Sequence, residues 1–282
     1  MSLAKPVPPI RRAVPLDRGL PPRAALDWLR AGWEDFRSVR PDASLFYGVL
    51  VMAVSMAIVI GLLLLRADYA LFPALAAFMV VGPALAVGLY EKSRRVASGE
   101  PVSLRAMLLA RVRSRGQILF VGVLLVLLVF LWVRAAVLLY ALFFGMHPFP
   151  GLDGIVTQLL TTSNGLGLLF VGSLFGGLFA ALGFAVSALS IPMLVNERTD
   201  AFSAMGASMA LTWNNLPVML VWGAVVVALF TLSVLSALFG LAIVFPLLGH
   251  ATWHAYVAIR GEPGSPILTP AIPEAETGAE TS

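Results

Sequence analysis

Apolar residues without charged neighbours gather in five long stretches of the chain. No Asp, Glu, Lys or Arg occurs in residues 43–65, 69–90, 116–133, 154–196 or 201–259. A helix that crosses a bilayer needs about 20 such residues, so each stretch is long enough for at least one crossing. The pattern therefore predicts a polytopic membrane protein made of helices.

The length of each stretch indicates how many crossings it contains. Residues 217–259 have to supply two, because a single helix of 43 residues would be about twice as long as the membrane is thick. Gly240 lies near the midpoint of this stretch, where we expect a tight turn. The prediction is an all-α bundle of six transmembrane helices, with spans at about 45–65, 69–90, 117–140, 168–193, 217–238 and 241–259.

Amphipathic segments between the spans predict interfacial helices. In residues 23–39, the side chains of Leu26, Leu29, Trp33 and Phe36 share one helical face. This helix lies either on the inner membrane surface or against the bundle itself, and both alternatives stay open. Two more interfacial helices are predicted over 102–113 and 201–213. Each of the three precedes a span, which suggests three units of one surface helix and two crossings.

The distribution of basic residues predicts the orientation. Seventeen of the 19 Lys and Arg residues fall in the segments on one side of the predicted spans, and only Arg66 falls on the other. Cytoplasmic loops of membrane proteins carry the excess of Lys and Arg. The protein is therefore expected in a bacterial inner membrane, with both termini on the cytoplasmic side. Residues 1–22 and 261–282 are expected to be disordered cytoplasmic tails, since neither composition can form a core.

Composition excludes several classes of protein. A chain with 59% hydrophobic and 12% charged residues is not an ordinary soluble enzyme. The absence of cysteine excludes disulfides, thiolate metal sites and cysteine nucleophiles. The net charge of +4 follows from the topology, so the expected partner is the lipid bilayer and not a nucleic acid. The motifs of phosphate loops, zinc proteases and serine hydrolases do not occur.

Two histidines in the last predicted span are the main candidates for chemistry. His250 and His254 are one helical turn apart, so their imidazoles lie on one face and could bind a metal or a haem. Two imidazoles do not complete a tetrahedral site, and the predicted spans contain no Cys, Asp or Glu to add. We therefore expect a structural role with no cofactor, and metal or haem binding is the weaker alternative.

Arg134 is the third candidate for a polar or ligand-binding role. It follows 18 uncharged residues, which make about 27 Å of helix. Its guanidinium is therefore expected to reach the outer headgroups, and substrate binding is the alternative.

Small residues form a flat face on the fourth span. Such a face allows the backbones of two helices to approach closely. We expect it to pack within the bundle, and homodimerisation is the alternative. Its members are Gly172, Gly176, Ala180, Gly183 and Ser187.

Two segments resemble a known bacterial membrane family. Residues 28–48, which include WLRAGWEDF and SLFYG, and residues 246–256, PLLGHATWHAY, resemble the family named domain of unknown function 2189. The resemblance covers roughly residues 20–260 and implies a multi-span inner-membrane protein with no assigned reaction. Some relatives carry labels that link them to subunit I of cytochrome c oxidase. That subunit binds its haems and copper through more histidines than the His147, His250 and His254 of this chain.

These observations favour a non-enzymatic accessory or organising subunit of a membrane complex. A homo-oligomer is a further expectation of the same kind. The alternative is a passive channel or small-solute carrier with a polar path lined by His250, Ser187 and Ser190. Haem or metal binding through His250 and His254 is the weaker alternative.

Overall fold

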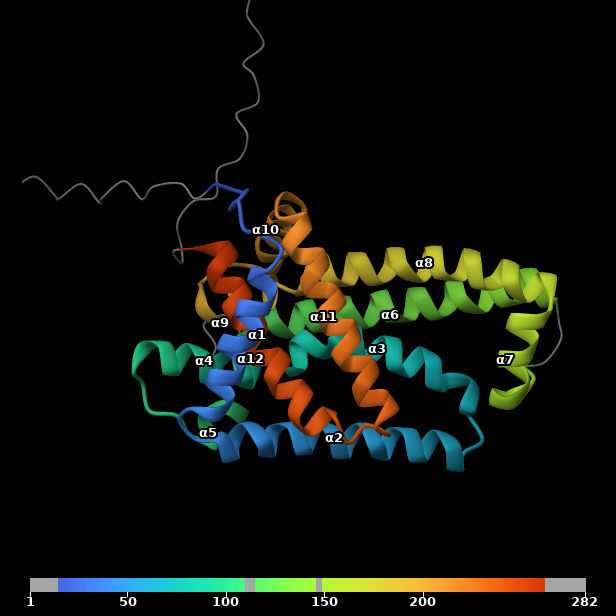
Figure 1. Ribbon diagram of the computed structural model, residues 1–282, viewed down its shortest axis with the longest axis horizontal. Coiled ribbons are helices and arrows are strands. Elements are labelled where there is room, and N and C mark those ends of the chain that lie inside the picture. The colour runs from blue at the N-terminus through green and yellow to red at the C-terminus, as the bar shows by residue number, and fades with distance from the viewer. Residues whose placement is uncertain (1–14, 110–114, 146–148, 262–282) are drawn as a thin grey trace, which may run out of the picture.

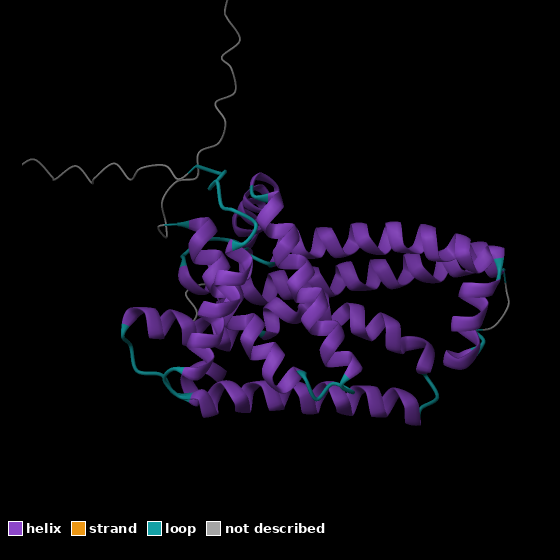
Figure 2. Cartoon of the chain, in the orientation of Figure 1, coloured by secondary structure: helices purple, strands orange, loops and turns teal. Residues whose placement is uncertain are grey.

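The computed structural model describes residues 15–109, 115–145 and 149–261 of the chain. Within these ranges every regular element is a helix (Figure 2), which confirms the all-α fold class. Six helical segments in the described ranges are long and apolar enough to cross a membrane. They are Pro41–Leu64, Asp68–Ser98, Gly116–Phe144, Ser163–Asn196, Leu216–Leu235 and Leu241–Arg260.

The elements follow one another with short connections. Their bounds are α1 Ala24–Arg37, α2 Pro41–Leu64, η1 Asp68–Ala70, α3 Leu71–Leu85, α4 Val87–Ser98, α5 Leu104–Leu108, α6 Arg115–Phe144, α7 Gly151–Thr161, α8 Ser163–Ser187, α9 Ser190–Asn196, α10 Ala201–Asn214, α11 Leu216–Leu235 and α12 Leu241–Arg260.

The helices run between two distinct ends of the bundle (Figure 1). Helices α2, α3, α6 and α8 follow the long axis, and α11 and α12 cross it obliquely. Helix α7 closes one end, which we call the α7 end. Helices α1, α4, α5, α9 and α10 gather at the other, which we call the polar end. The first and last described segments also lie at the polar end, where the Arg18 guanidinium is close to Gly261.

Proline interrupts the second span and sets the start of α4. Pro83 cannot donate a backbone hydrogen bond, and its ring crowds the preceding turn, so the helix is broken at Ala86. The chain then resumes as α4 and stays helical to Ser98. The sequence predicts the end of this span at residue 90 and a loop beyond it. The structure instead places Glu91 and Lys92 in a helix, with both side chains fully buried.

Helix α1 docks on the bundle with a face that differs from the predicted one. Of the predicted apolar face, Leu26 and Trp33 are 57% and 39% exposed, whereas Phe36 is buried. The buried face contains Ala25, Trp28 and Gly32, and the Trp28 ring makes an edge contact with Trp222 of α11. A methyl group at Gly32 would lie 2.6 Å from the Ala251 nitrogen of α12. Small residues therefore let α1 and α12 approach closely, as in the docked alternative.

The other surface segments also differ in detail from the predictions. Helix α5 is shorter than the predicted 102–113, of which residues 110–113 lie outside the described residues. Of the predicted tails, residues 1–14 and 262–282 also lie outside them. Residues 15–22 are held on the bundle, because the Asn215 side chain accepts from the Arg18 N–H at 3.0 Å and donates to the Leu16 carbonyl at 2.8 Å. The three-unit repeat stays a prediction.

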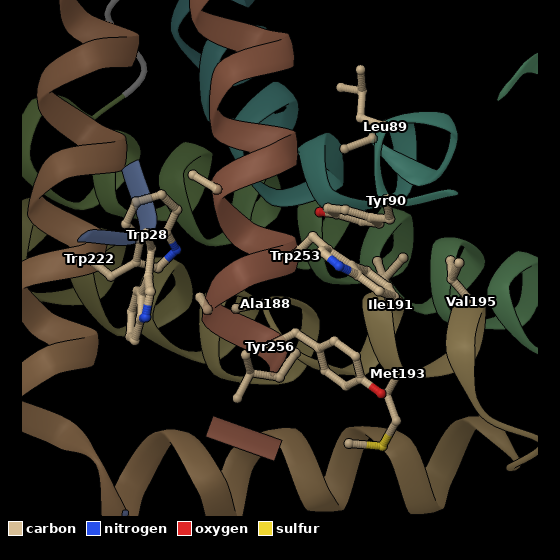
Figure 3. Close-up of a cluster of buried hydrophobic side chains, with 14 of the residues drawn as sticks. Trp28, Leu89, Tyr90, Ala188, Ile191, Met193, Val195, Trp222, Trp253 and Tyr256 are labelled. Carbon is tan, nitrogen blue, oxygen red and sulfur yellow. The ribbon is translucent and has the colours of Figure 1, made fainter. Parts of the chain in front are cut away.

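Large buried side chains concentrate toward the polar end. Figure 3 shows Tyr90 of α4 next to Trp253 of α12, and Trp28 next to Trp222 across the α12 ribbon from them. Gly249 lets α4 come close to α12, because a Cβ there would lie 2.6 Å from a methyl carbon of Leu89. By contrast, α3 contains no fully buried residue. The tightly packed core is therefore the part of the molecule that positions the polar groups described next.

Candidate functional site

His250 lies at the centre of a buried polar network at the polar end. Its side chain is fully buried in α12. The ring Nε2 is 3.0 Å from the hydroxyl of Ser44 in α2, and Nδ1 is 2.8 Å from the hydroxyl of Ser93 in α4. The two partners are 206 and 157 residues away in the sequence. The predicted hydrogen bonding to neighbouring helices is thus present for this ring.

Lys92 is the buried charge of the network, and the sequence analysis missed it. Its ammonium donates to the Ser44 hydroxyl at 2.8 Å and to the carbonyls of Phe36 and Arg40 at 3.5 and 3.4 Å. These three acceptors match the three donors of an ammonium. The two carbonyls belong to the end of α1 and its connection to α2. Lys92 therefore fixes the point at which α1 leads into the membrane helix.

An ammonium can only donate, so the Ser44 hydroxyl accepts from Lys92. A hydroxyl oxygen has a second lone pair, so Ser44 either donates to Nε2 of a neutral His250 ring or accepts from it, and Ser93 then takes the complementary role at Nδ1. In both arrangements the ring is held between two serine hydroxyls. The Ser93 hydroxyl also lies near the carboxylate of Asp35 in α1.

His254 joins the network through Asp35. Its Nε2 lies 2.9 Å from Oδ2 of Asp35. The His254 side chain is 31% exposed and that of Asp35 is 11% exposed, so this pair lies nearer to solvent than His250. Burial by itself would raise the pKa of Asp35. The hydrogen bond with His254 and the nearby Ser93 hydroxyl outweigh burial and hold that pKa below its usual value.

We call these six side chains the His250 network: Asp35, Ser44, Lys92, Ser93, His250 and His254. They come from α1, α2, α4 and α12, so the network ties together four helices that are far apart in the chain.

A second cluster links α12 to the end of α9. The Arg260 guanidinium donates to both carboxylate oxygens of Glu197, at 3.1 and 2.9 Å, and the Tyr256 hydroxyl donates to Glu197 at 2.8 Å. Asn196 donates to the Tyr256 oxygen at 3.1 Å. All of these oxygens and nitrogens lie in buried or half-buried side chains. We call this group the Glu197 cluster. The sequence analysis did not predict a role for Arg260.

Glu91 forms a third buried charge at the polar end. Its carboxylate accepts from both Arg94 and Arg95, at 2.9 and 2.7 Å, and these arginines are largely buried as well. These charges can be buried because the carboxylate and the guanidinium groups neutralise one another and are hydrogen-bonded.

The other predicted site residues lie elsewhere. Arg134 is exposed on α6 and is separate from the His250 network. His147 lies outside the described residues. Of the small-residue face, a Cβ added at Gly183 would lie 3.4 Å from Val80 of α3 and 3.6 Å from Leu128 of α6. A Cβ added at Gly176 would lie 3.7 Å from the Trp132 indole nitrogen.

The rest of this face is less uniform. Ser187 is buried and donates to the Gly183 carbonyl at 2.7 Å, whereas Ala180 is exposed and Gly172 meets only Leu168 of its own helix. The contacts that exist lie within the bundle.

Metal binding finds little support in this geometry. Within the described residues, no group of three or more His, Cys, Asp or Glu side chains is placed to hold a metal ion. Both ring nitrogens of His250 are already hydrogen-bonded to serines, so a metal would have to displace one of them.

Six apolar helices and an all-helical fold define a polytopic integral membrane protein. Residues 71–196 match the model of a family described as "Predicted integral membrane protein (DUF2189)", which confirms the family resemblance for this part of the chain. The match lies between the two segments that carried the resemblance. It supplies Lys92 and Ser93, and the two flanking segments supply the other four members of the His250 network.

The chain matched no curated protein and no solved structure.

Proposed function

We propose that this protein is a non-enzymatic accessory or organising subunit of a membrane complex. One observation carries the proposal: the side chains at the centre of the His250 network are hydrogen-bonded to one another and buried. Lys92, Ser44 and His250 have no exposed surface, and Ser93 is 1% exposed. A catalytic or transport site has to admit a substrate, whereas this network favours a role in holding helices in place.

The proposed location is a bacterial inner membrane, with the polar end and both termini on the cytoplasmic side. Arg23, Arg30 and Arg37 are exposed at the polar end, and Arg66 lies beyond the opposite end of α2. The excess of basic residues on the polar end supports this orientation.

Exposed apolar surface on α8 supports association within the membrane. Phe170, Leu174 and Leu178 follow one another at one-turn spacing and are 76%, 66% and 65% exposed. Lipid covers such a face when the protein is alone, and a second membrane protein covers it in a complex.

The test combines purification with site-specific cross-linking. A photoreactive residue at Leu174 is expected to give a reproducible cross-link to another protein in intact membranes, and gentle solubilisation is expected to retain that complex. The matched control is Val186, which is buried in the same helix and should form links only within the chain. A solitary monomer at every expression level, with no link from Leu174, would contradict the proposal.

The alternative function is a passive channel or carrier. The observation in its favour is the Ser190 hydroxyl, which is buried and has no hydrogen-bond partner among the described atoms. Such a group suits a water or a polar solute. Solute flux into liposomes that is lost in His250→Leu would favour this alternative over the accessory role.

Haem or metal binding through His250 and His254 is the third candidate. A Soret band or stoichiometric metal in the purified protein would favour it.

A further inference from the structure

We propose that the outer face of α1 binds the headgroups of anionic phospholipids in the leaflet at the polar end. This inference goes beyond the accessory role, because it assigns a chemical class of ligand to a surface that faces away from the bundle. It rests on the proposed placement of the polar end at a membrane surface.

Exposed side chains of α1 form one stripe outside its buried face. They follow one another at spacings of four, three and four residues, so they lie within about 60° of one another around the helix axis. Asp27 and Glu34 are also exposed, but they lie beyond one edge of this stripe. The stripe therefore combines apolar and basic groups without a carboxylate. We call it the outer stripe, and its members are Leu26, Arg30, Trp33 and Arg37.

The two arginines of the outer stripe are not paired with acidic side chains. Elsewhere at the polar end, the Arg260 guanidinium lies 2.9 Å from the Glu197 carboxylate. Among the described residues, no carboxylate lies within ion-pair distance of Arg30 or Arg37, although Glu34 is one turn from Arg30. Their guanidinium groups are thus available to an external anion, and the planar donors of arginine match the oxygens of a phosphate.

The Trp33 ring is held in place beside one of these arginines. It stacks on the ring of Phe36, which is buried, with 5.3 Å between the ring centroids. The Arg37 guanidinium lies 5.9 Å from the centroid of the Trp33 ring. Tryptophan is enriched at the level of lipid headgroups, because its ring is apolar and its N–H is polar. The outer stripe therefore has both an aromatic anchor and cations for a headgroup.

The position of α1 in the chain matches the depth of the headgroups. Figure 1 shows α1 running across the long axis of the bundle at the polar end. It ends at Arg37, and the charge-free stretch that enters the membrane begins at residue 43. Leu45 and Phe46 of α2 are already 44% and 48% exposed, as expected for side chains in lipid. The headgroup layer is about 5–7 Å deep on each side of the hydrocarbon core, so the outer stripe lies next to it.

Helix α10 provides an internal reference at the same end of the molecule. It exposes Phe202, Met209 and Trp213 by 67%, 43% and 76%. No residue of this helix, Ala201–Asn214, is charged. We therefore expect α10 to contact lipid without regard to headgroup charge, whereas the outer stripe of α1 should select anionic headgroups.

The experiment uses the full chain in nanodiscs of phosphatidylcholine and phosphatidylglycerol, with bromine on the acyl chains of one lipid at a time. Bromine quenches nearby tryptophans, and the difference between the unmodified chain and Trp33→Phe isolates the Trp33 signal. Phosphatidylglycerol is expected to be preferred at Trp33 by about fivefold. This factor corresponds to the contribution of about 1 kcal/mol from one basic residue near an anionic surface.

Trp213, isolated in the same way with Trp213→Phe, should show no preference between the two lipids. Equal quenching of Trp33 by the two lipids would overturn the recognition of anionic headgroups. Quenching of Trp213 but not of Trp33 by either lipid would also overturn the proposal, because another protein or a second copy of the chain would then cover the outer stripe.

Variants of the arginines identify the cause of the preference. Arg30→Gln and Arg37→Gln together should abolish the preference at Trp33, whereas lysine at both positions keeps the charge and should retain it. Arg134→Gln is the matched control, because it removes an exposed arginine from α6 and should leave the preference unchanged. A preference that survives the two glutamines would contradict the proposal.

A salt series on the unmodified chain provides a test that needs no variant of the arginines. The preference at Trp33 should fall between about 0.01 and 1 M ionic strength, because the Debye length decreases from about 30 to 3 Å. A preference that does not depend on salt would contradict an electrostatic site. The accessory role is tested separately at Leu174 of α8, so either proposal can fail without the other.

Discussion

At the polar end, charged and polar side chains are buried in pairs and chains, whereas the helices toward the α7 end present apolar side chains to their surroundings. Lys92 and His250 have no exposed surface, while Leu64 at the end of α2 and Phe170 on α8 are 79% and 76% exposed. The difference follows from the two environments of a membrane protein. Lipid is as apolar as the exposed side chains, so only close packing and polar contacts hold helices together there. The polar end therefore has to supply most of the specific contacts between helices.

The strongest test of this comparison is the removal of the buried charge. Lys92→Met leaves the Ser44 hydroxyl and the carbonyls of Phe36 and Arg40 without their donor. We expect a loss of about 3–5 kcal/mol, because three buried acceptors each lose a partner at a cost of about 1–3 kcal/mol. Thermal unfolding in detergent measures this loss.

Arg134→Met is the control for that measurement. It removes the same charge from an exposed position on α6, so a change within about 0.5 kcal/mol is expected. Equal losses in the two variants would show that the polar end is not special.

Glycine substitutions in α2 compare the two ends within one helix. A Cβ at Gly48 would overlap the carbonyl oxygen of Ala242 in α12, whereas Gly61 has nothing within 4 Å. Gly48→Ala should cost about 1–3 kcal/mol because neither backbone can move easily. Gly61→Ala should be neutral or slightly stabilising, because alanine favours the helix. The same unfolding assay would contradict the assigned packing if Gly61→Ala were the more harmful.

The Glu197 cluster provides a smaller effect at the polar end than the removal of the Lys92 charge. Glu197→Gln keeps the shape of the side chain but removes the charge that binds Arg260 and accepts from Tyr256. We expect a loss of about 1.5–3 kcal/mol, as for hydrogen bonds to charged groups. Glu34→Gln on the exposed face of α1 should change stability little, and a comparable loss there would argue against a specific cluster.

Acid provides the mildest test. The Asp35 pKa is lower in the folded protein than its ordinary value of 3.8. Its contribution to docking is therefore fully present above that value and is lost as the pH falls through the lower, folded pKa. A spin label on a single cysteine that replaces the exposed Glu34 reports the mobility of α1. This label should stay immobile near neutral pH and become mobile only in strong acid. In Asp35→Asn this contribution is absent at every pH, and identical acid profiles in the two proteins would exclude Asp35 as the titrating group.

The sequence allowed the membrane class and the apolar helices to be predicted, because charge-free stretches of this length have few other solutions. It failed at Lys92 because a charged residue after an apolar stretch was interpreted as the beginning of a loop. Pro83 indicates a break in the helix but not that the helix resumes at α4.

The site was predictable only in part. His250 and His254 stood out as ionisable residues in a membrane helix, and the structure places both in the network. Their serine and carboxylate partners could not be found, because pairing across about 150–220 positions leaves no periodic pattern in one sequence. The docked face of α1 could not be predicted for a related reason. Its close contact with α12 is at Gly32, and amphipathic patterns give weight to large apolar residues instead.

The dependence of α1 on α12 has a consequence for biogenesis. Among the described residues, the first helix, α1, packs against the last, α12, and the His250 network requires residues from both. Until α12 has been synthesised, the network around Lys92 lacks His250, and α1 has no α12 to dock on. The earlier spans are therefore inserted before the polar end can be completed. Truncation before Leu241 is expected to leave the N-terminal helix undocked, however well the earlier membrane segments insert.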